Sequence, residues 1–296
     1  MNRHVLFLIA AMLLVGSNVG IGKSIVVVVP ILLFALLRFV VAVGVLLPLY
    51  RLDKMRRVSR EEWVNLFLQA FFGTFLFTLL MLSGVHRTTA VAAGVITSTI
   101  PATVALLAWL LLKERPGPRA IVAIVLAIAG VIVVTLARES GESGSGSLTG
   151  NVMVLGAVLC ESTYVILSRR LTQTLSPIDI CAYTHGFGLL LMLPFGIVSL
   201  IGFDFAAVPA QIWLLVVWYA LSASIFSFWL WMKGIRHVPG QLAGVFTAVL
   251  PVAAAAYGIV FLGERPTIAH GIALACVVAG VGIASLRSRH MRPVPS

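Results

Sequence analysis

The chain has few charged side chains and few cysteines. Only 10% of its 296 residues are Asp, Glu, Lys or Arg, whereas a soluble domain carries about 25%. This scarcity argues against an ordinary water-soluble protein. The three cysteines, Cys160, Cys181 and Cys276, fall inside apolar stretches, and their spacing fits neither a disulfide framework nor a zinc site. We therefore expect no bound metal and interpret these thiols as small apolar packing groups.

Long polar segments are also lacking. The loops are short, so they leave no room for a soluble domain that holds an active site or binds a nucleotide. We expect no catalytic residue and no cofactor. Residues 16–24, GSNVGIGKS, resemble a phosphate-binding loop, but such a loop needs glycine where Ser17 stands. Lys23 is better explained as a side chain that reaches the membrane interface.

What the sequence has in abundance is long apolar runs, with a mean hydropathy of +1.08. A helix needs about 20 apolar residues to cross the hydrocarbon core. The runs are too long and too uniformly apolar for the strands of a membrane barrel, which alternate. The sequence therefore predicts an all-α membrane protein with ten transmembrane helices, here called spans one to ten. They cover residues 5–22, 29–50, 64–83, 89–112, 118–137, 150–168, 178–200, 211–232, 240–262 and 267–286.

The positive charge follows the loops rather than one compact surface. The net charge is +11, which by itself would suit nucleic-acid binding. When alternate loops are assigned to opposite sides of the membrane, most Lys and Arg residues fall on the side of the two termini. Cytoplasmic loops carry such an excess. We therefore expect cytoplasmic N and C termini and no nucleic-acid partner.

An internal repeat organises the chain. Residues 84–131 align with residues 234–281 without a gap when the sequence is shifted by 150 positions. Each half holds five spans, and five is odd, so the second half enters the membrane from the opposite side. The repeats are therefore predicted to be inverted. The expected units are a first five-helix repeat (1–138), a Gly/Ser linker on the outer side (139–149), a second five-helix repeat (150–286) and a basic cytoplasmic tail (287–296).

Several motifs together resemble a known family. They are Gly16-Ser17-Asn18, the run at 32–49, Gly-Val-x-Thr-x-x-x-Pro at 94–101 and 244–251, the Glu-Arg-Pro after each copy, and YVILSRR at 164–170. The chain thereby resembles the EamA-type ten-helix transporters of the drug/metabolite transporter superfamily. The resemblance implies a multi-pass exporter or exchanger of small metabolites, amino acids among them, in the bacterial inner membrane.

Two repeated prolines, Pro101 and Pro251, lie near the middle of spans four and nine. Proline lacks an N–H and clashes with the carbonyl four residues earlier, which here belongs to Thr97 or Thr247. Helices interrupted at matching positions indicate a transporter's binding site. We expect Pro101 and Pro251 to act as hinges and both threonines to face the substrate cavity. The alternative is two ordinary proline kinks whose threonine hydroxyls satisfy the backbone.

Ionisable residues occur inside three spans: Arg38, Glu161 and His185. Charges at this depth are costly and usually face a bundle interior or a water-filled cavity. We expect Arg38 and Glu161 to line a central cavity, where they could bind the carboxylate and the ammonium of an amino acid. The alternative is a mutual structural salt bridge. Because desolvation and Arg38 act on Glu161 in opposite directions, proton antiport and facilitated efflux both stay open.

Other side chains complete the predicted cavity. Ser17 and Asn18 in span one fall near the positions that correspond to Ser162 and Thr163 in span six, and we include Asn18 in the cavity. Four deep aromatic residues could line the same space. They are Tyr164, Trp218, Tyr219 and Phe226. The alternative for each aromatic ring is packing against lipid or neighbouring helices.

The repeated acids Glu114 and Glu264 follow spans four and nine. Each is expected to pair locally or to cap the helix that comes next, because a carboxylate is favourable at a helix N-terminus.

Taken together, these features predict a secondary transporter that works by alternating access and exports small metabolites, amino acids foremost. Efflux of multiple drugs or cationic compounds, metabolite exchange, and a membrane enzyme acting on lipid-linked substrates are the alternatives. The expected partners are a small-molecule substrate and the lipid bilayer, and we expect a monomer or a weak homo-oligomer.

Overall fold

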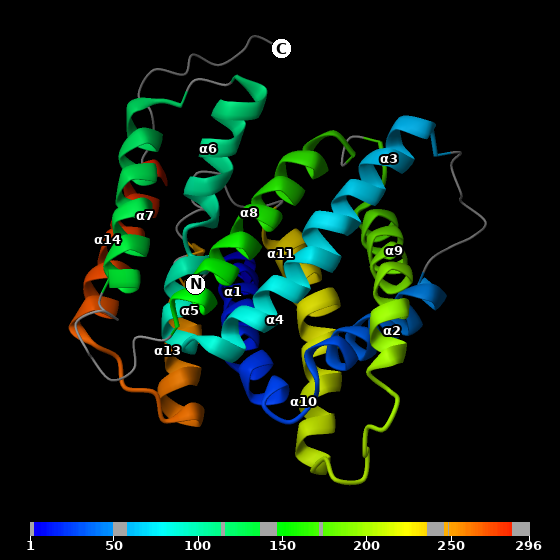
Figure 1. Cartoon of the computed structure of the whole chain (residues 1–296). Coiled ribbons are helices and arrows are strands. Elements are labelled where there is room, and N and C mark those ends of the chain that lie inside the picture. Colours follow the sequence, from blue (N-terminus) through cyan, green and yellow to red (C-terminus); the bar gives the residue numbers. More distant parts are fainter. Residues whose placement is uncertain are drawn as a thin grey trace.

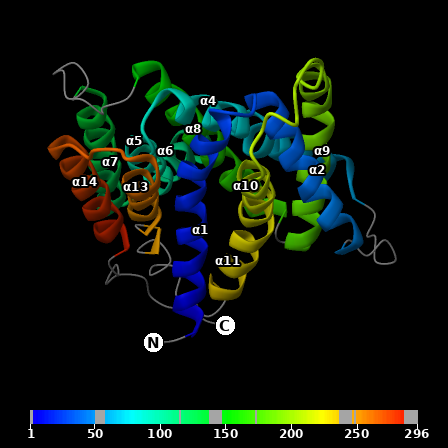
Figure 2. The same ribbon diagram turned by 90° about the horizontal axis from the view of Figure 1, so that it is seen from below.

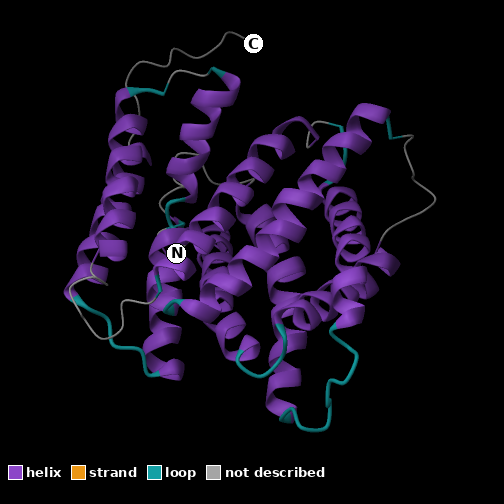
Figure 3. Ribbon diagram, viewed as in Figure 1, coloured by secondary structure: helices purple, strands orange, loops and turns teal. Residues whose placement is uncertain are grey.

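The computed structural model describes residues 3–49, 58–113, 116–136, 147–171, 174–235, 246–247 and 249–285. Throughout these ranges the regular secondary structure is helical, without a strand (Figure 3). Glu114, Arg115, Gly240, Gly244, most of the predicted linker (139–146) and the basic tail (287–296) lie outside the described residues.

The first half begins with α1 (Arg3–Val26) and α2 (Ile31–Leu49). A continuous helix follows, made of α3 (Arg60–Gln69), the π-helical segment η2 (Ala70–Leu76) and α4 (Phe77–Arg87). Ser59 starts it with a capping box, because its hydroxyl accepts from the N–H of Glu62 and the Glu62 carboxylate accepts from the N–H of Ser59. Next come α5 (Ala90–Thr97), α6 (Ile100–Leu112) and α7 (Pro118–Leu136).

The second half contains α8 (Leu148–Leu171) and α9 (Pro177–Val198). A continuous helix again follows, made of α10 (Ala210–Leu221), η3 (Ser222–Phe226) and α11 (Ser227–Ile235). The last two helices are α13 (Val249–Leu262) and α14 (Ile268–Ser285).

Helix lengths establish a multi-pass membrane protein. Among the described residues, seven helical stretches are long and apolar enough to cross a membrane. Three further apolar helices, Pro118–Val133, Val249–Leu262 and Ile268–Ile283, are shorter. The all-helical membrane fold is thus confirmed, whereas the number of ten spans stays a prediction.

Helix packing joins the two halves along their whole length. The most extensive contact pairs α7 with α14, and α2 with α9 and α5 with α13 also pack across the two halves, as do α1 with α13 and α4 with α8. Three of these pairs, α7 with α14, α2 with α9 and α5 with α13, are of particular interest for the repeat. Figures 1 and 2 both show α7 and α14 side by side at one end of the molecule and α2 and α9 side by side at the other. Each of these three pairs joins spans that the predicted repeat treats as equivalent. This pairing agrees with an inverted repeat, which itself stays a prediction.

The two π-helical segments occupy matching places in the chain. A shift of 150 residues puts η3, at 222–226, onto residues 72–76 of η2. A π-helical turn interrupts the regular ladder of hydrogen bonds and is frequent at functional sites. The side chains around η2 and η3 are therefore candidates for the functional site.

Both repeated prolines lie at helix starts. α5 ends at Thr97, α6 begins at Ile100, and Pro101 stands in the first turn of α6. Pro251 likewise lies in the first turn of α13. Proline is tolerated there because the N–H that it lacks would have no partner within the helix. Span four is accordingly two helices separated by Ser98 and Thr99.

Candidate functional site

Arg38 lies in the interior between helices of both halves. It projects from α2, and only 7% of the residue is exposed. Its Nη1 donates to Thr78 Oγ1 on α4 at 2.6 Å. The guanidinium carbon is 5.5 Å from the centre of the Phe39 ring and 5.6 Å from that of Tyr219, within the range of cation–π attraction. One hydrogen bond and two rings therefore hold the cation in place.

The hydroxyl of Thr78 links Arg38 to the π-helical segment η2. Thr78 Oγ1 donates its single proton to the carbonyl of Thr74, 2.6 Å away. Its lone pairs are then left to accept from Arg38. Thr74 belongs to η2. Because its carbonyl can only accept, Thr78 must donate to Thr74 and accept from Arg38.

Within the residues that the structure describes, the rest of the guanidinium makes no hydrogen bond. The buried Nε of Arg38 makes no hydrogen bond, and among the described residues no carboxylate lies within ion-pair distance of it. The alternative expectation, a direct salt bridge between Arg38 and Glu161, is therefore not formed. Glu161 belongs to α8, and the charge of Arg38 acts on it without a direct ion pair.

His185 on α9 occupies the second part of this interior. Its Nδ1 is 2.9 Å from the carbonyl of Cys181; because a carbonyl only accepts, Nδ1 carries the proton. Its buried Nε2 has no partner within the described part of the chain. The thiol of Cys181 in turn donates to the carbonyl of Ser224 in η3 at 3.5 Å. Cys181 thus takes part in polar contacts, beyond the packing role expected for it.

The two anchoring carbonyls are related by the repeat spacing. Thr74 lies in η2 and Ser224 lies in η3, 150 residues apart. Each accepts from the side chain of Thr78 or Cys181, which also contacts Arg38 or His185, respectively. Arg38, Glu161 and His185 are called the central cluster below. The sequence analysis missed Thr74, Thr78 and Ser224, because only the folded helices bring them to Arg38 and His185. The signal available in the sequence was a hydroxyl at both 74 and 224.

Other predicted residues lie around this centre. Tyr219 on α10 is buried and packs edge-on against Phe34, and the guanidinium of Arg38 lies over its ring. Tyr164 on α8 is half-buried against Gly73 of η2, where an added Cβ would lie 2.5 Å from the tyrosine side chain. Asn18 on α1 is buried, and its Oδ1 accepts from Ser222 of η3 at 2.9 Å. Both π-helical segments therefore face predicted cavity residues.

The structure leaves several predicted residues apart from this cluster. Trp218 and Phe226 are 44% and 39% exposed and pack against each other at 6.3 Å. Thr97 is buried at the end of α5, where its hydroxyl donates to carbonyls of its own helix. Thr247 lies two residues before Val249, the first residue of α13.

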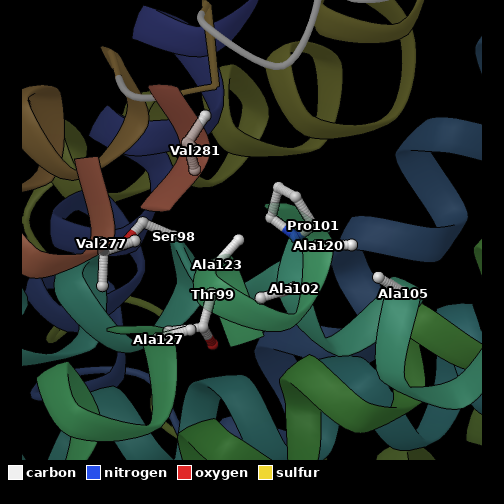
Figure 4. Close-up of a pocket in the computed structure, with 10 residues that line it drawn as sticks. All are labelled: Ser98, Thr99, Pro101, Ala102, Ala105, Ala120, Ala123, Ala127, Val277 and Val281. Carbon is white, nitrogen blue, oxygen red and sulfur yellow. The ribbon is translucent and has the colours of Figure 1, made fainter. Parts of the chain in front are cut away.

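A small cavity adjoins the interruption between α5 and α6. It has a volume of about 50 Å³ and is lined mainly by small apolar side chains of α6, α7 and α14. Figure 4 shows Ser98, Thr99 and Pro101 among the residues that line it, together with Ala123, Ala127 and Val277. The Ser98 and Thr99 hydroxyls donate to carbonyls of α5. The cavity is therefore small and mainly apolar, and its two hydroxyls already donate to the backbone.

Glu264 makes a different contact from the one expected. Its Oε1 lies 2.6 Å from Lys23 Nζ at the end of α1 and accepts from the N–H of Ala90 at 2.8 Å. Its Oε2 accepts from the N–H of Val91 at 3.1 Å. The expectation that Glu264 pairs locally or caps the following helix is therefore wrong. It caps α5, because folding brings the end of α13 beside the start of α5.

Comparisons with known proteins agree with this membrane fold. The sequence model of the EamA-like transporter family matches residues 2–136 and 148–286. A Bacillus subtilis protein named "Uncharacterized transporter YetK" is 33% identical over 98% of this chain and 88% of its own length. An "Uncharacterized transporter" of Archaeoglobus fulgidus is 22% identical over 77% of this chain and 78% of its own.

A solved crystal structure shares the fold, with a TM-score of 0.64 and 20% identity over 96% of this chain and 97% of that chain. The resemblance seen in the sequence motifs is thus confirmed by a family match that covers both halves of the protein. The chain belongs to the EamA-like transporter family.

Proposed function

We propose that this membrane transporter exports small metabolites, amino acids foremost, across the bacterial inner membrane by alternating access. The observation that carries the proposal is the interior around Arg38, whose buried guanidinium forms no ion pair with Glu161 or any other described carboxylate and keeps an Nε without a described partner. Charged groups inside membrane spans are costly and mark substrate pathways. An amino acid carries both charges needed to complement this cluster.

The arrangement of helices supports alternating access. The two halves, 1–138 and 150–286, supply equivalent helices to the central cluster, as inverted-repeat transporters do around a site near the middle of the membrane. Span four is interrupted just before Pro101, and a cavity adjoins the interruption. In this proposal, bending at Pro101 and Pro251 opens the cluster to each side in turn.

Two other transport functions make different demands on the same site. Efflux of cationic compounds would use Glu161 as its principal contact and would not require Arg38. Metabolite exchange would show obligatory coupling of influx and efflux. A membrane enzyme acting on lipid-linked substrates would show chemical turnover without solute exchange.

Counterflow in proteoliposomes separates these possibilities. Vesicles loaded with one unlabelled amino acid would be offered the same radiolabelled amino acid, over a panel of amino acids and cationic dyes, with and without a pH gradient. We expect accumulation of at least one amino acid driven by its unlabelled form. Flux of dyes alone would reject amino-acid export, and flux without stimulation from the opposite side would indicate a channel.

The role of Glu161 is tested in the same vesicles. We expect Glu161→Gln to reduce transport or alter its dependence on pH, because the substituted side chain cannot ionise. Glu61→Gln is the matched control, since Glu61 is exposed at the start of α3. Normal transport by Glu161→Gln with unchanged pH dependence would contradict the role given to this residue.

A further inference from the structure

We propose that Arg38 binds a carboxylate of the substrate through its Nε–Nη2 edge, and that Thr78 is the residue that positions this edge. The inference rests on the transport function proposed above and refines it, because it names the group of the substrate that is recognised. It also assigns a role to a threonine that does not itself touch the substrate.

The donors of Arg38 that remain unpaired form one side of the guanidinium. Nη1 is used by Thr78, whereas Nε is buried without a partner and no hydrogen bond of Nη2 is formed within the described part of the chain. Nε and Nη2 project as two parallel N–H groups. This is the fork that a carboxylate accepts in a bidentate pair.

Burial makes an unpaired fork costly unless something occupies it. A guanidinium stays protonated in proteins, so Arg38 cannot reduce this cost by losing its charge. A buried charged donor without an acceptor loses its hydrogen bonds to water, and no hydrogen bond within the protein compensates for this loss. A carboxylate of the substrate would supply both the missing acceptors and the missing negative charge.

The rings beside Arg38 restrict what can approach it. Phe39 and Tyr219 each lie within 6 Å of the guanidinium carbon, and Tyr219 is itself held edge-on by Phe34 at 5.0 Å. Attraction between the cation and the rings does not use the in-plane N–H groups. The rings therefore fix the plane of the guanidinium while leaving the Nε–Nη2 edge available.

Thr78 fixes the rotation of the guanidinium within that plane. Its proton is already given to the Thr74 carbonyl in η2, so it presents only lone pairs to Nη1. Without this acceptor, Nη1 would compete with Nε for the carboxylate, and the fork would lose its preferred orientation. Thr78 is thus a positioning residue whose influence passes through Arg38.

The equivalent place in the second half lacks a permanent charge. There the carbonyl of Ser224 accepts from the Cys181 thiol, and His185 stands next to that thiol. An imidazole with its Nδ1 proton engaged offers a single acceptor at Nε2 rather than a fork of donors. The two halves therefore supply different partners, and the carboxylate is assigned to the first.

The test uses the full-length protein purified in detergent. Its thermal midpoint would be measured with each of the twenty amino acids and, in parallel, with the corresponding carboxamides at the same concentration. We expect one or more amino acids to stabilise the protein while their carboxamides do not, because an amide carries no negative charge. Stabilisation by the carboxamides to the same extent, or by no amino acid at all, would overturn the carboxylate site.

Variants of Thr78 test positioning against a merely structural role. We expect Thr78→Val to raise the KM for a stabilising amino acid roughly two- to tenfold, the value of one hydrogen bond, with little change in kcat. Thr78→Ser keeps the hydroxyl and should restore the KM. The result that would overturn the role is an equal KM for Thr78→Val and Thr78→Ser, or a fall in kcat alone.

Failure of this inference can be told apart from failure of the transport proposal. Flux of cationic dyes, or of amino acids that compete equally with their carboxamides, would leave a transporter without a carboxylate site at Arg38. Absence of any counterflow in vesicles containing folded protein would instead reject the transport mechanism. Arg87→Gln is the control for removing a guanidinium, because Arg87 is exposed and, among the described residues, its guanidinium bonds to the Ser83 carbonyl of its own helix and to Met153.

Discussion

Two charged centres of this protein differ in how completely their hydrogen bonds are satisfied. At the first, the Glu264 carboxylate forms an ion pair with Lys23 and accepts hydrogen bonds from two backbone N–H groups of α5, so both of its oxygens have partners. At the second, Arg38 makes one hydrogen bond to the described residues and keeps a buried Nε without a partner among them. Both centres connect helices that are distant in the sequence.

This difference separates a structural contact from a binding site. Lys23, Glu264 and the start of α5 complete one another, so a solute would have to displace an existing partner. Arg38 offers donors that nothing in the described part of the chain accepts. A satisfied buried charge contributes to stability, whereas an unsatisfied one costs free energy that a ligand can recover. Mutations at the two centres should therefore affect different measurements.

The largest expected effect is that of Arg38→Gln on affinity. Removal of a charge-assisted pair should raise the KM for a transported amino acid about ten- to hundredfold, while thermal stability changes little because the unpaired charge disappears as well. Counterflow and thermal unfolding of the same preparation would measure both quantities. A loss of stability without a change in KM would assign Arg38 to the structural class.

The next effect is that of Glu264→Gln on stability. The amide would lose the attraction of Lys23 and one of its acceptors at α5, which should lower the free energy of unfolding by about 1–3 kcal/mol. The lower part of this range applies because Lys23 is partly exposed. Chemical unfolding in detergent would measure it, with the KM expected to stay near that of the unmodified protein.

A double-mutant cycle with Lys23→Met sharpens this prediction. If Lys23 and Glu264 act as a pair, the double substitution should destabilise the protein by less than the two single substitutions added together. Strict additivity would show that the α5 N–H groups, and not Lys23, supply the stabilisation.

A smaller effect is expected on transport rate from substitution of both hinge prolines. The Pro101→Ala, Pro251→Ala protein would lose the two rings that keep the preceding segment from continuing into α6 or α13, which should favour one conformation and slow the flux about fivefold, as a shift of about 1 kcal/mol would. Counterflow rate at saturating amino acid is the measurement. Unimpaired flux would reject the hinge role of both residues.

The smallest effect concerns Ser222 in η3. Ser222→Ala removes the bond to Asn18 Oδ1 and should cost about 1 kcal/mol of stability or less. Thermal unfolding would measure this change. A loss comparable to that of Glu264→Gln would mean that the Ser222 hydroxyl contributes more to stability than its one bond to Asn18 accounts for.

Comparison of these centres also shows how far sequence reasoning reached. Arg38, Glu161 and His185 were recognised because ionisable residues are rare in apolar spans, and that rarity is visible without a structure. Thr78 and Thr74 were missed, because hydroxyls are common in membrane helices and their partners lie on other helices. The contact of Glu264 with α5 was misassigned, since it joins residues 174 positions apart and nothing local indicates it.

The amino-acid sequence by itself determined that this is an all-helical membrane transporter of the EamA-like family, because hydropathy, helix length and repeated motifs are properties of the chain alone. It also indicated an interruption near Pro101, since proline cannot complete a helical ladder. Only the tertiary structure decided which buried charges are satisfied. Whether a side chain has a hydrogen-bond partner depends on helices from both halves meeting in space, and so Glu264 became a cap while Arg38 kept an open edge.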